Sequence, residues 1–344
     1  IAGVLCYDCV PEGHDAARDP VYLFVHGGAF VAGGGVFAKA VGGRAADATG
    51  VRVVSVDYRM PPEDPFPAAP EDCVAVYRAL LETIDPAILA AAPDGTAAME
   101  DFLPGSVTDC LVSTIVYSTA IGYDTTKFPE APTKIADFFD LEKFPGKRGM
   151  RKGAKVNLEM ALMADGVAPA DVYATLDTPE GVDRAFAKLD TIKADTLWWE
   201  AGAQPPQLLA DGEVAMTTAY NGRIFAAAVG EGKPFAIMWD GQVLEYEGYV
   251  IPKGTQNLEL AKEFLAYATT SQKLADQASW ISYGPARKSS GALVGMYKDG
   301  KTPMGPHMPT AAENLTGALP SSYEFWVDKD SELNERFNAW LATN

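Results

Sequence analysis

One unit of alternating structure, from Thr196 to Phe225, constrains the fold more than any other part of the sequence. Its apolar start ends in Trp-Trp-Glu, and a Pro-containing loop opens into a helix-like run that closes at Asp-Gly. An apolar strand follows and ends at Tyr220. This alternation predicts an α/β fold. In open α/β sheets ligands bind beyond the carboxyl ends of strands, so the two strand ends are the first places to look for a site.

Aromatic and polar side chains gather at both of these strand ends. Trp199 and Glu200 end the first strand, and Tyr220, Asn221 and Arg223 end the second. Aromatic faces beside a carboxylate can hold a cationic amine, at about 0.5 to 2 kcal/mol per cation–π contact. Arg223 would instead repel an amine or clamp a carboxylate, which keeps an amino acid open as the solute. The alternative is that these rings belong to the core, where Trp and Tyr are common.

The length and charge of the chain exclude several classes of protein. With 344 residues, 48% of them hydrophobic, the chain can bury two sizeable cores. A formal net charge of −18 argues against nucleic acid as a partner, because phosphates favour a basic surface. We find no apolar run of the roughly 18 to 20 residues that spanning a bilayer requires. The opening residues also lack the basic region of a signal peptide, so the residues alone do not indicate export.

From about residue 83 to residue 344 the chain resembles one family over several ordered stretches. They include "IADFFDLEKFPGKRG", "WWEAGAQPPQLLADGEVAMTTAYNGR" and "YVIPKGTQNLELAKEFLAYAT". This part resembles extracellular solute-binding proteins of the polyamine (spermidine/putrescine) type, the receptor subunits of ABC importers. The resemblance implies a two-lobed α/β fold of the type II periplasmic-binding-protein class. It also implies a periplasmic or extracellular monomer that is not an enzyme, needs no cofactor and works with an ABC permease.

The resemblance also implies how a solute would be held. The solute would be small and cationic or zwitterionic, a polyamine or an amino acid. Tyr117 and Ser118 would lie where the chain crosses between lobes, and Glu247 and Tyr249 lie where this family places polar cleft residues. Binding would bias a hinge-closing equilibrium that the permease reads. The expected ligand residues are Gly27, Gly28, Tyr117, Ser118, Trp199, Glu200, Tyr220, Asn221, Arg223, Glu247 and Tyr249, with no metal ligand and no catalytic residue.

Residues 1–82 resemble a different family. The stretches "PVYLFVHGGAFVAGGG" and "ATGVRVVSVDYRMPPEDPF" are similar to the amino-terminal part of hormone-sensitive-lipase-type esterases, which have the α/β-hydrolase fold. The apolar pattern predicts a βαβα unit with strands over 21–25 and 51–56 and helices over 37–49 and 71–81. We therefore expect two regions: residues 1–82, which form part of the first lobe, and residues 83–344, which form the rest of that lobe, the hinge and the second lobe.

A carboxylesterase is the alternative function, and the sequence disfavours it. The glycines Gly27 and Gly28 follow His26 in a motif that in such esterases supplies backbone N–H groups to an oxyanion. The chain contains no G-x-S-x-G nucleophile elbow, and His307 is the one histidine late enough to act as the base. By analogy with the first turn of solute-binding proteins, the two glycines could instead border the solute. A third alternative is a chimera that folds and retains neither activity.

The four cysteines leave their pairing open. Cys6 and Cys9 form a C-x-x-C, but no second pair or histidine cluster accompanies it to complete a zinc site. Cys73 and Cys110 could form a disulfide in an oxidising compartment. Four cysteines permit three connectivities, and sequence alone does not select one.

Three local patterns give further expectations. Glu159 opens a helix, where it is either a partner of the helix dipole or of a bound amine. Asp240 and Gly241 predict a turn between two strands. A run of basic residues predicts a solvated face, with binding of an anion as the alternative; it consists of Lys147, Arg148, Arg151 and Lys152.

Overall fold

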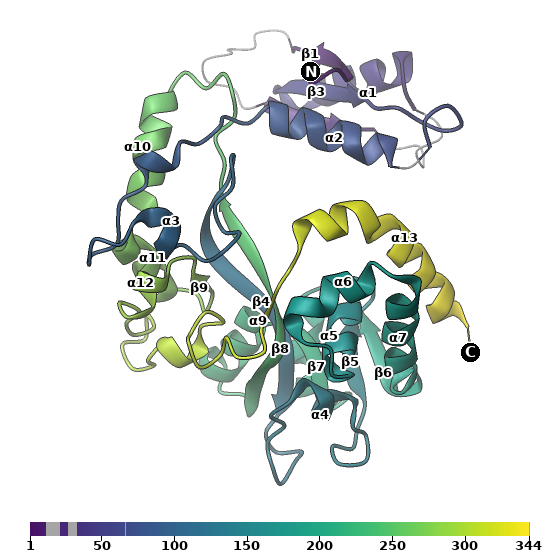
Figure 1. Ribbon diagram of the computed structural model, residues 1–344, viewed down its shortest axis with the longest axis vertical. Coiled ribbons are helices and arrows are strands. Elements are labelled where there is room, and N and C mark those ends of the chain that lie inside the picture. The colour runs from purple at the N-terminus through teal and green to yellow at the C-terminus, as the bar shows by residue number, and fades with distance from the viewer. Residues whose placement is uncertain (12–20, 27–32, 66, 344) are drawn as a thin grey trace. The chain divides into compact units, whose positions relative to one another are not determined.

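The computed structural model describes residues 1–11, 21–26, 33–65 and 67–343 (Figure 1). Its contacts divide the chain into two compact units. Unit 1 comprises Ile1–Ile88, Val107–Val112 and Tyr249–Ala266. Unit 2 comprises Leu89–Ser106, Ser113–Gly248 and Tyr267–Asn344. The predicted division of the chain at residue 82 stays a prediction.

Unit 1 is built on a three-stranded sheet with the order β1-β3-β2. The central strand β3 runs antiparallel to β1 and parallel to β2. The βαβα unit predicted from the apolar pattern is confirmed, with boundaries within three residues, whereas β1 was not predicted. The elements are β1 (Leu5–Cys9), β2 (Val21–Val25), α1 (Val36–Thr49), β3 (Arg52–Asp57) and α2 (Ala68–Ala79).

Helices cover both faces of β3, which explains its continuous apolar sequence. On one face Val53 packs with Ala46 of α1. On the other, Val54 and Val56 pack with Val76 of α2. Helix α1 approaches closely at Gly42, where a Cβ atom would lie 2.6 Å from the Cβ of Ser55. A glycine is therefore required at this contact.

Unit 2 contains a seven-stranded mixed sheet with the order β10-β8-β4-β7-β5-β6, and β9 pairs with β4 beside this path. Strand β5 runs parallel to β6 and β7, and β4 runs antiparallel to β7. The strand predicted over 213–220 is confirmed as the shorter β7, and the apolar segment predicted to end at Trp-Trp-Glu forms β6. The strands are β4 (Val112–Asp124), β5 (Arg148–Arg151), β6 (Thr196–Trp199), β7 (Met216–Tyr220), β8 (Phe235–Tyr249), β9 (Gly284–Pro285) and β10 (Leu319–Pro320).

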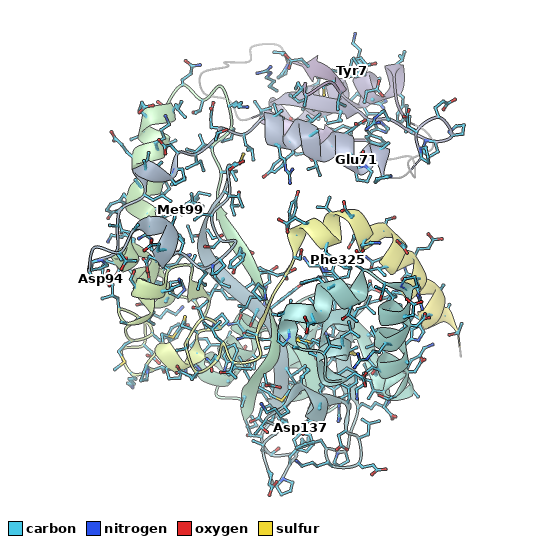
Figure 2. The ribbon with its side chains drawn as sticks, in the orientation of Figure 1. Tyr7, Glu71, Asp94, Met99, Asp137 and Phe325 are labelled. Carbon is cyan, nitrogen blue, oxygen red and sulfur yellow. The ribbon has the colours of Figure 1, made fainter. Side chains whose placement is uncertain are left out.

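The largest core of unit 2 lies where α5 and α7 pack with the carboxyl-terminal helix α13. All eight residues of α5 are buried, and Phe337 of α13 is fully buried in the same core. Figure 2 shows Phe325 on α13, whose ring lies 5.1 Å from that of Tyr173. The helices of unit 2 are α3 (Ala98–Asp101), α4 (Ile135–Phe139), α5 (Asn157–Ala164), α6 (Val172–Leu176), α7 (Pro179–Asp190), α8 (Gln204–Ala210), α9 (Asn221–Phe225), α11 (Ser271–Ala278), α12 (Lys288–Gly291) and α13 (Tyr323–Ala342), whereas most of α10 (Leu258–Ala268) belongs to unit 1.

The turn predicted at Asp240 and Gly241 is wrong, because β8 continues through both residues. The Asp-Gly pair indicated a turn because glycine readily adopts a positive φ, and Gly241 does have a φ of 76° within the strand. A Cβ atom at Gly241 would lie 2.5 Å from the Cβ of Ile135 in α4. The glycine therefore allows a helix to pack closely against the strand.

The predicted solvated face of four basic residues is wrong for Arg148, which is fully buried. Its guanidinium donates hydrogen bonds to the carbonyls of Phe138 at 2.6 Å, Gly146 at 2.6 Å and Phe144 at 2.7 Å. These carbonyls follow or end α4, where helix geometry leaves acceptors without partners. Burial lowers the pKa of Arg148 to about 10. The side chain therefore closes a loop and binds no anion.

Glu159 is not an amine partner, because it is buried completely in unit 2. One carboxylate oxygen accepts hydrogen bonds from Trp326 Nε1 at 2.6 Å and from the Tyr173 hydroxyl at 3.3 Å. The other oxygen, Oε2, has no hydrogen-bond partner. Burial raises the pKa of Glu159 to about 7. The residue thus joins the first turn of α5 to α6 and α13.

Candidate functional site

Three tyrosine rings lie together in unit 2 and form what we call the tyrosine cluster: Tyr117, Tyr220 and Tyr283. The centroid of the Tyr117 ring lies 5.8 Å from that of Tyr220 and 5.9 Å from that of Tyr283. Strand pairing accounts for this arrangement. Tyr117 lies on β4, which pairs with β7 from Thr119 opposite Tyr220 and with β9 from Val116 opposite Gly284. Both neighbouring strands therefore deliver a tyrosine beside Tyr117.

Two glycines make room for the rings of the tyrosine cluster. A Cβ atom at Gly202 would lie 2.7 Å from a ring carbon of Tyr220, and one at Gly222 would lie 2.7 Å from a ring carbon of Tyr283. Any larger residue at these positions would push against an aromatic ring. The loop after β6 and the start of α9 thus shape the cluster.

Trp199 contacts the tyrosine cluster through Tyr220. Its ring meets that of Tyr220 edge-on, with centroids 5.9 Å apart, and the residue is only 1% exposed. Its Nε1 is buried without a hydrogen-bond partner. We predicted that Trp199 supplies an aromatic face to the solute, and this role stays a prediction; in this structure its ring packs on that of Tyr220.

The side-chain amide of Asn221 forms hydrogen bonds within unit 2. Its Oδ1 accepts a hydrogen bond from the backbone N–H of Ser118 at 3.0 Å, and its Nδ2 donates to the carbonyl of Ser282 at 2.5 Å. The side chain is 1% exposed, and Ser118 is fully buried. Asn221 therefore holds β4 and the segment before β9 in place around the cluster, and the predicted solute contacts of Asn221 and Ser118 stay predictions.

Charged side chains of both signs act on the tyrosine cluster. Burial raises the pKa of Tyr117, and the neighbouring Glu245 and Glu247 raise it further. Burial likewise raises the pKa of Tyr283, while Arg223 lowers it and Glu247 raises it. Arg223 is exposed on α9 and Glu247 is exposed on β8. A cation and an anion thus lie close enough to the cluster to act on its hydroxyl groups electrostatically.

The structure adds Lys155 and Glu245 to the site. Lys155 Nζ lies 2.6 Å from Glu245 Oε1, and both side chains are largely buried. The next residue, Val156, has a φ of 75°, a strained conformation for a β-branched residue. Because successive side chains of a strand alternate between faces, the spacing of Glu245 and Glu247 was the signal that could have found Glu245. No comparable signal in the sequence marks Lys155 or Tyr283.

Residues 54–310, more than half of the chain, match the model of a family described as bacterial extracellular solute-binding protein. The chain belongs to this family. Solved structures that resemble it include a GABA receptor, which is 29% identical with a TM-score of 0.64; the match covers 95% of this chain and 98% of the receptor. The expected type II periplasmic-binding-protein fold is therefore confirmed.

A γ-aminobutyric acid-binding protein from Pseudomonas aeruginosa is 51% identical to this solute-binding protein over 241 residues. The match covers 70% of this chain and 66% of the relative, so the chain spans slightly less than two thirds of that protein's length. Family members are binding proteins, in agreement with the expectation that the chain is not an enzyme.

This solute-binding protein is also similar to hydrolases: an acetyl-hydrolase from Streptomyces hygroscopicus is 27% identical over 266 residues, which cover 76% of this chain. Esterase LipI from Mycobacterium tuberculosis is 47% identical over 78 residues, which cover 21% of this chain and 22% of the esterase. His26 is 3% exposed and stacks on Tyr58, with centroids 4.1 Å apart. The following Gly27 and Gly28 lie outside the described residues, so their predicted role stays a prediction.

Two further predicted ligand residues, Glu200 and Tyr249, contact other side chains within their own units. The side chain of Glu200 is 71% exposed and pairs with Lys152, with Nζ and Oε1 2.9 Å apart. Tyr249 belongs to unit 1, where its ring packs on Phe264 with centroids 5.4 Å apart. Their roles in solute binding stay predictions.

Neither a metal site nor a membrane span is found in the part of the solute-binding protein that the structure describes. These residues contain no group of three or more His, Cys, Asp or Glu side chains that could hold a metal ion. None of their helices is both long enough and apolar enough to cross a membrane.

Proposed function

We propose that this protein captures a small zwitterion, an amino acid whose ammonium and carboxylate groups are separated by a short chain. The observation that carries the proposal is the pair of opposite charges, Arg223 and Glu247, that act on the tyrosine cluster. γ-Aminobutyrate is the leading candidate, since the Pseudomonas aeruginosa relative is named for binding it.

In the part of the site that the structure describes, one cation and one anion remain available to pair with the two charged groups of a zwitterion. Lys155 already neutralises Glu245. Among the described residues, neither Arg223 nor Glu247 forms an ion pair within 4.0 Å. Arg223 would clamp the solute carboxylate in a bidentate manner, and Glu247 would pair with the ammonium group. The faces of the tyrosines would add cation–π attraction for the ammonium group.

A polyamine suits this arrangement less well. It carries positive charge at both ends, so one end would approach Arg223 and be repelled. Of the two acidic side chains beside the cluster, only Glu247 would remain to bind an amine. We therefore rank polyamines below γ-aminobutyrate as the solute, and the ligand panel described below distinguishes the two.

We further infer that the solute-loaded protein delivers its cargo to an ABC permease outside the cytoplasmic membrane. The family description as extracellular solute-binding protein supports this role. In this role the protein binds and releases its solute unchanged, so no side chain has to act as an acid, base or nucleophile. The predicted closing of a hinge on binding belongs to the same proposal.

The first experiment is a thermal-shift and calorimetric panel of γ-aminobutyrate, shorter and longer ω-amino acids, putrescine and spermidine. A ligand that binds only the folded state at about 100 times its Kd adds roughly 2.7 kcal/mol to the free energy of unfolding. γ-Aminobutyrate should raise the melting midpoint, and putrescine should not. A shift with polyamines alone would contradict the proposal.

The variants Arg223→Met and Glu247→Gln test the two ends of the solute separately. Each removes one charge-assisted contact, worth about 1.5 to 3 kcal/mol, so each should weaken γ-aminobutyrate binding by roughly tenfold or more. Arg223→Met should also remove the discrimination against putrescine. Arg184→Met and Glu335→Gln, at exposed positions of α7 and α13, are the matched controls and should bind as the wild type does. Unchanged binding in both site variants would place the solute elsewhere.

A further inference from the structure

The four cysteines of the chain are unpaired in the structure, and all four lie in unit 1. Cys6 and Cys9 are on β1, Cys73 is on α2, and Cys110 follows in the segment Val107–Val112. Their positions can therefore be compared within one compact unit. The comparison selects one pairing among those that the sequence permits.

Cys6 and Cys9 cannot pair with each other, because they lie on opposite faces of β1. Side chains alternate along a strand, so residues three apart point in opposite directions. Cys9 is paired with Val53 in the sheet, packs in the layer next to α1, and its Sγ lies 3.8 Å from the carbonyl oxygen of Lys39. Tyr7, which Figure 2 shows on the same strand, packs in the same layer. The C-x-x-C motif therefore forms neither a disulfide nor a shared metal site.

Cys6 faces the other side of the sheet, toward α2. It is paired with Val56, whose side chain belongs to the layer between β3 and α2. Cys73 enters this layer from the opposite side, since Ala69, Cys73 and Val76 follow one another at helical spacing along α2. Both cysteines pack against the same buried cluster. Cys110 is not one of the residues that form or border this cluster.

The two thiols are also electrostatic neighbours. Burial raises the pKa of Cys73 to about 11, and a negative charge on Cys6 contributes to this shift. Burial is likewise the largest cause that raises the pKa of Cys6. Both side chains are half-buried, so a small oxidant can reach them.

We propose that Cys6 and Cys73 form a disulfide when the protein is in an oxidising compartment, and that this bond ties β1 to α2 on the face of the sheet that α2 covers. The family description as extracellular supports exposure to such a compartment. The inference does not depend on which solute the protein binds. It replaces the pairing of Cys73 with Cys110 that the sequence left open.

The step is a thiol–disulfide exchange with a disulfide oxidant such as oxidised glutathione. The Cys6 thiolate attacks the oxidant, forms a mixed disulfide and releases one glutathione thiolate. The Cys73 thiolate then attacks the Cys6 sulfur of the mixed disulfide and releases the second glutathione. Two protein thiols each lose a proton, and together they pass two electrons to the glutathione disulfide, which is reduced to two thiols. Because the thiolate is the nucleophile, the raised pKa values make the reaction faster at pH 9 than at pH 7.

The test is to incubate the full chain with oxidised glutathione and to map its peptides without reduction. We expect a protein lighter by the mass of two hydrogen atoms, with two of its four thiols lost to titration and a single cross-linked peptide pair containing Cys6 and Cys73. The cross-link should form faster as the pH is raised from 7 to 9. Reducing agent should restore all four thiols.

Matched variants separate this pairing from its alternatives. Cys9→Ala and Cys110→Ala should form the cross-link as the wild type does, whereas Cys6→Ala and Cys73→Ala should not form it. Because peptide mapping of the wild type gives the pairing directly, a variant that fails to fold does not prevent a decision. A cross-link between Cys6 and Cys9 or between Cys73 and Cys110 would overturn the proposal, as would a product that carries only mixed disulfides with glutathione.

Discussion

At the residue scale, three charged or titratable side chains interact with other protein groups. Lys155 and Glu245 neutralise each other beside the tyrosine cluster, and Glu159 is buried with one unpartnered oxygen. A buried ion pair that loses one partner leaves an uncompensated charge. We can therefore predict whether a substitution at these positions raises or lowers the solute affinity or the free energy of unfolding.

Lys155→Met should shift the selectivity of the protein toward diamines. Without its cation, Glu245 would present a second negative charge beside Glu247, and a dication such as putrescine would gain one charge-assisted contact. We expect putrescine affinity to rise by roughly tenfold, since such a contact is worth about 1.5 kcal/mol or more. Isothermal titration calorimetry measures the change. Lys152→Met is the control, because Lys152 pairs with the exposed Glu200; equal effects of both variants would refute the assignment.

Glu159→Gln should stabilise the protein at neutral and higher pH. The pKa of Glu159 is about 7 in the folded protein against an ordinary value of 4.5, so the folded state holds the proton more tightly. Its contribution to stability is constant below pH 4.5, falls as the pH rises from 4.5 to 7, and stays low above that, at about 1.4 kcal/mol per pKa unit. Glutamine keeps the acceptor for Trp326 and carries no charge to bury.

The measurement is urea unfolding of wild type and variant across this pH range. The difference in unfolding free energy between Glu159→Gln and the wild type should grow between pH 4.5 and 7 in favour of the variant. Glu180→Gln is the matched control, since Glu180 also lies in the first turn of a helix but is exposed. A difference that does not vary with pH would show that Glu159 titrates normally.

At the scale of elements, glycines with positive φ decide how closely strands and helices approach. Gly241 lets β8 continue while α4 packs against it, and its conformation disfavours any side chain. From the sequence alone such a glycine predicts a turn, because glycine occurs both in turns and where a helix packs closely on a strand. The contact with Ile135 distinguishes the two cases.

Gly241→Ala should destabilise unit 2 more than a positive φ alone explains. The added Cβ would meet Ile135 as well as adopt a strained backbone, and we expect a total loss of roughly 2 to 4 kcal/mol in the free energy of unfolding. Gly166→Ala is the control, because Gly166 has a φ of 88° and no atom within 4 Å of the added Cβ. Denaturant unfolding of the two variants isolates the packing contribution. If both variants lost the same free energy of unfolding, the contact of the added Cβ with Ile135 would contribute nothing, and α4 would shift without loss of stability.

At the scale of the whole molecule, contacts between distant parts of the chain hold each unit together. In unit 2 the fully buried Arg287 pairs with Asp101 at 3.2 Å and donates to the carbonyl of Ala90 at 2.8 Å. Asp101 also accepts hydrogen bonds from the backbone N–H and the hydroxyl of Ser289. The segment before β4 is thereby joined to the segment after β9.

Asp101→Ala should be strongly destabilising, because it leaves the guanidinium of Arg287 buried without its counter-charge. Removal of one partner of a buried pair costs about 3 to 5 kcal/mol. The double variant with Arg287→Met should lose less than the sum of the two single variants, since no unpaired charge remains. Denaturant unfolding of the four proteins gives the coupling. Additive losses would show that the pair contributes no coupling to the stability of unit 2.

The sequence by itself determined the local elements and the family. Apolar runs and helical spacing located β3, α1, α2 and β7, because the order of residues along a segment reflects whether one face or both are buried. The sequence also placed Tyr220 and Arg223 at the end of a strand, because the apolar run of that strand stops at Tyr220. These are properties of short segments, and they do not depend on which segments become neighbours.

Only the tertiary structure decided which side chains meet. Tyr283 joins Tyr117 because β9 pairs with β4, and Lys155 reaches Glu245 across 90 residues of sequence. Asn221 and Arg148 looked like surface or ligand-facing groups, yet backbone groups brought close by folding use their hydrogen bonds. The pairing of Cys6 with Cys73 has the same origin. Sheet register and helix packing set these contacts, and neither is encoded in the periodicity of any single segment.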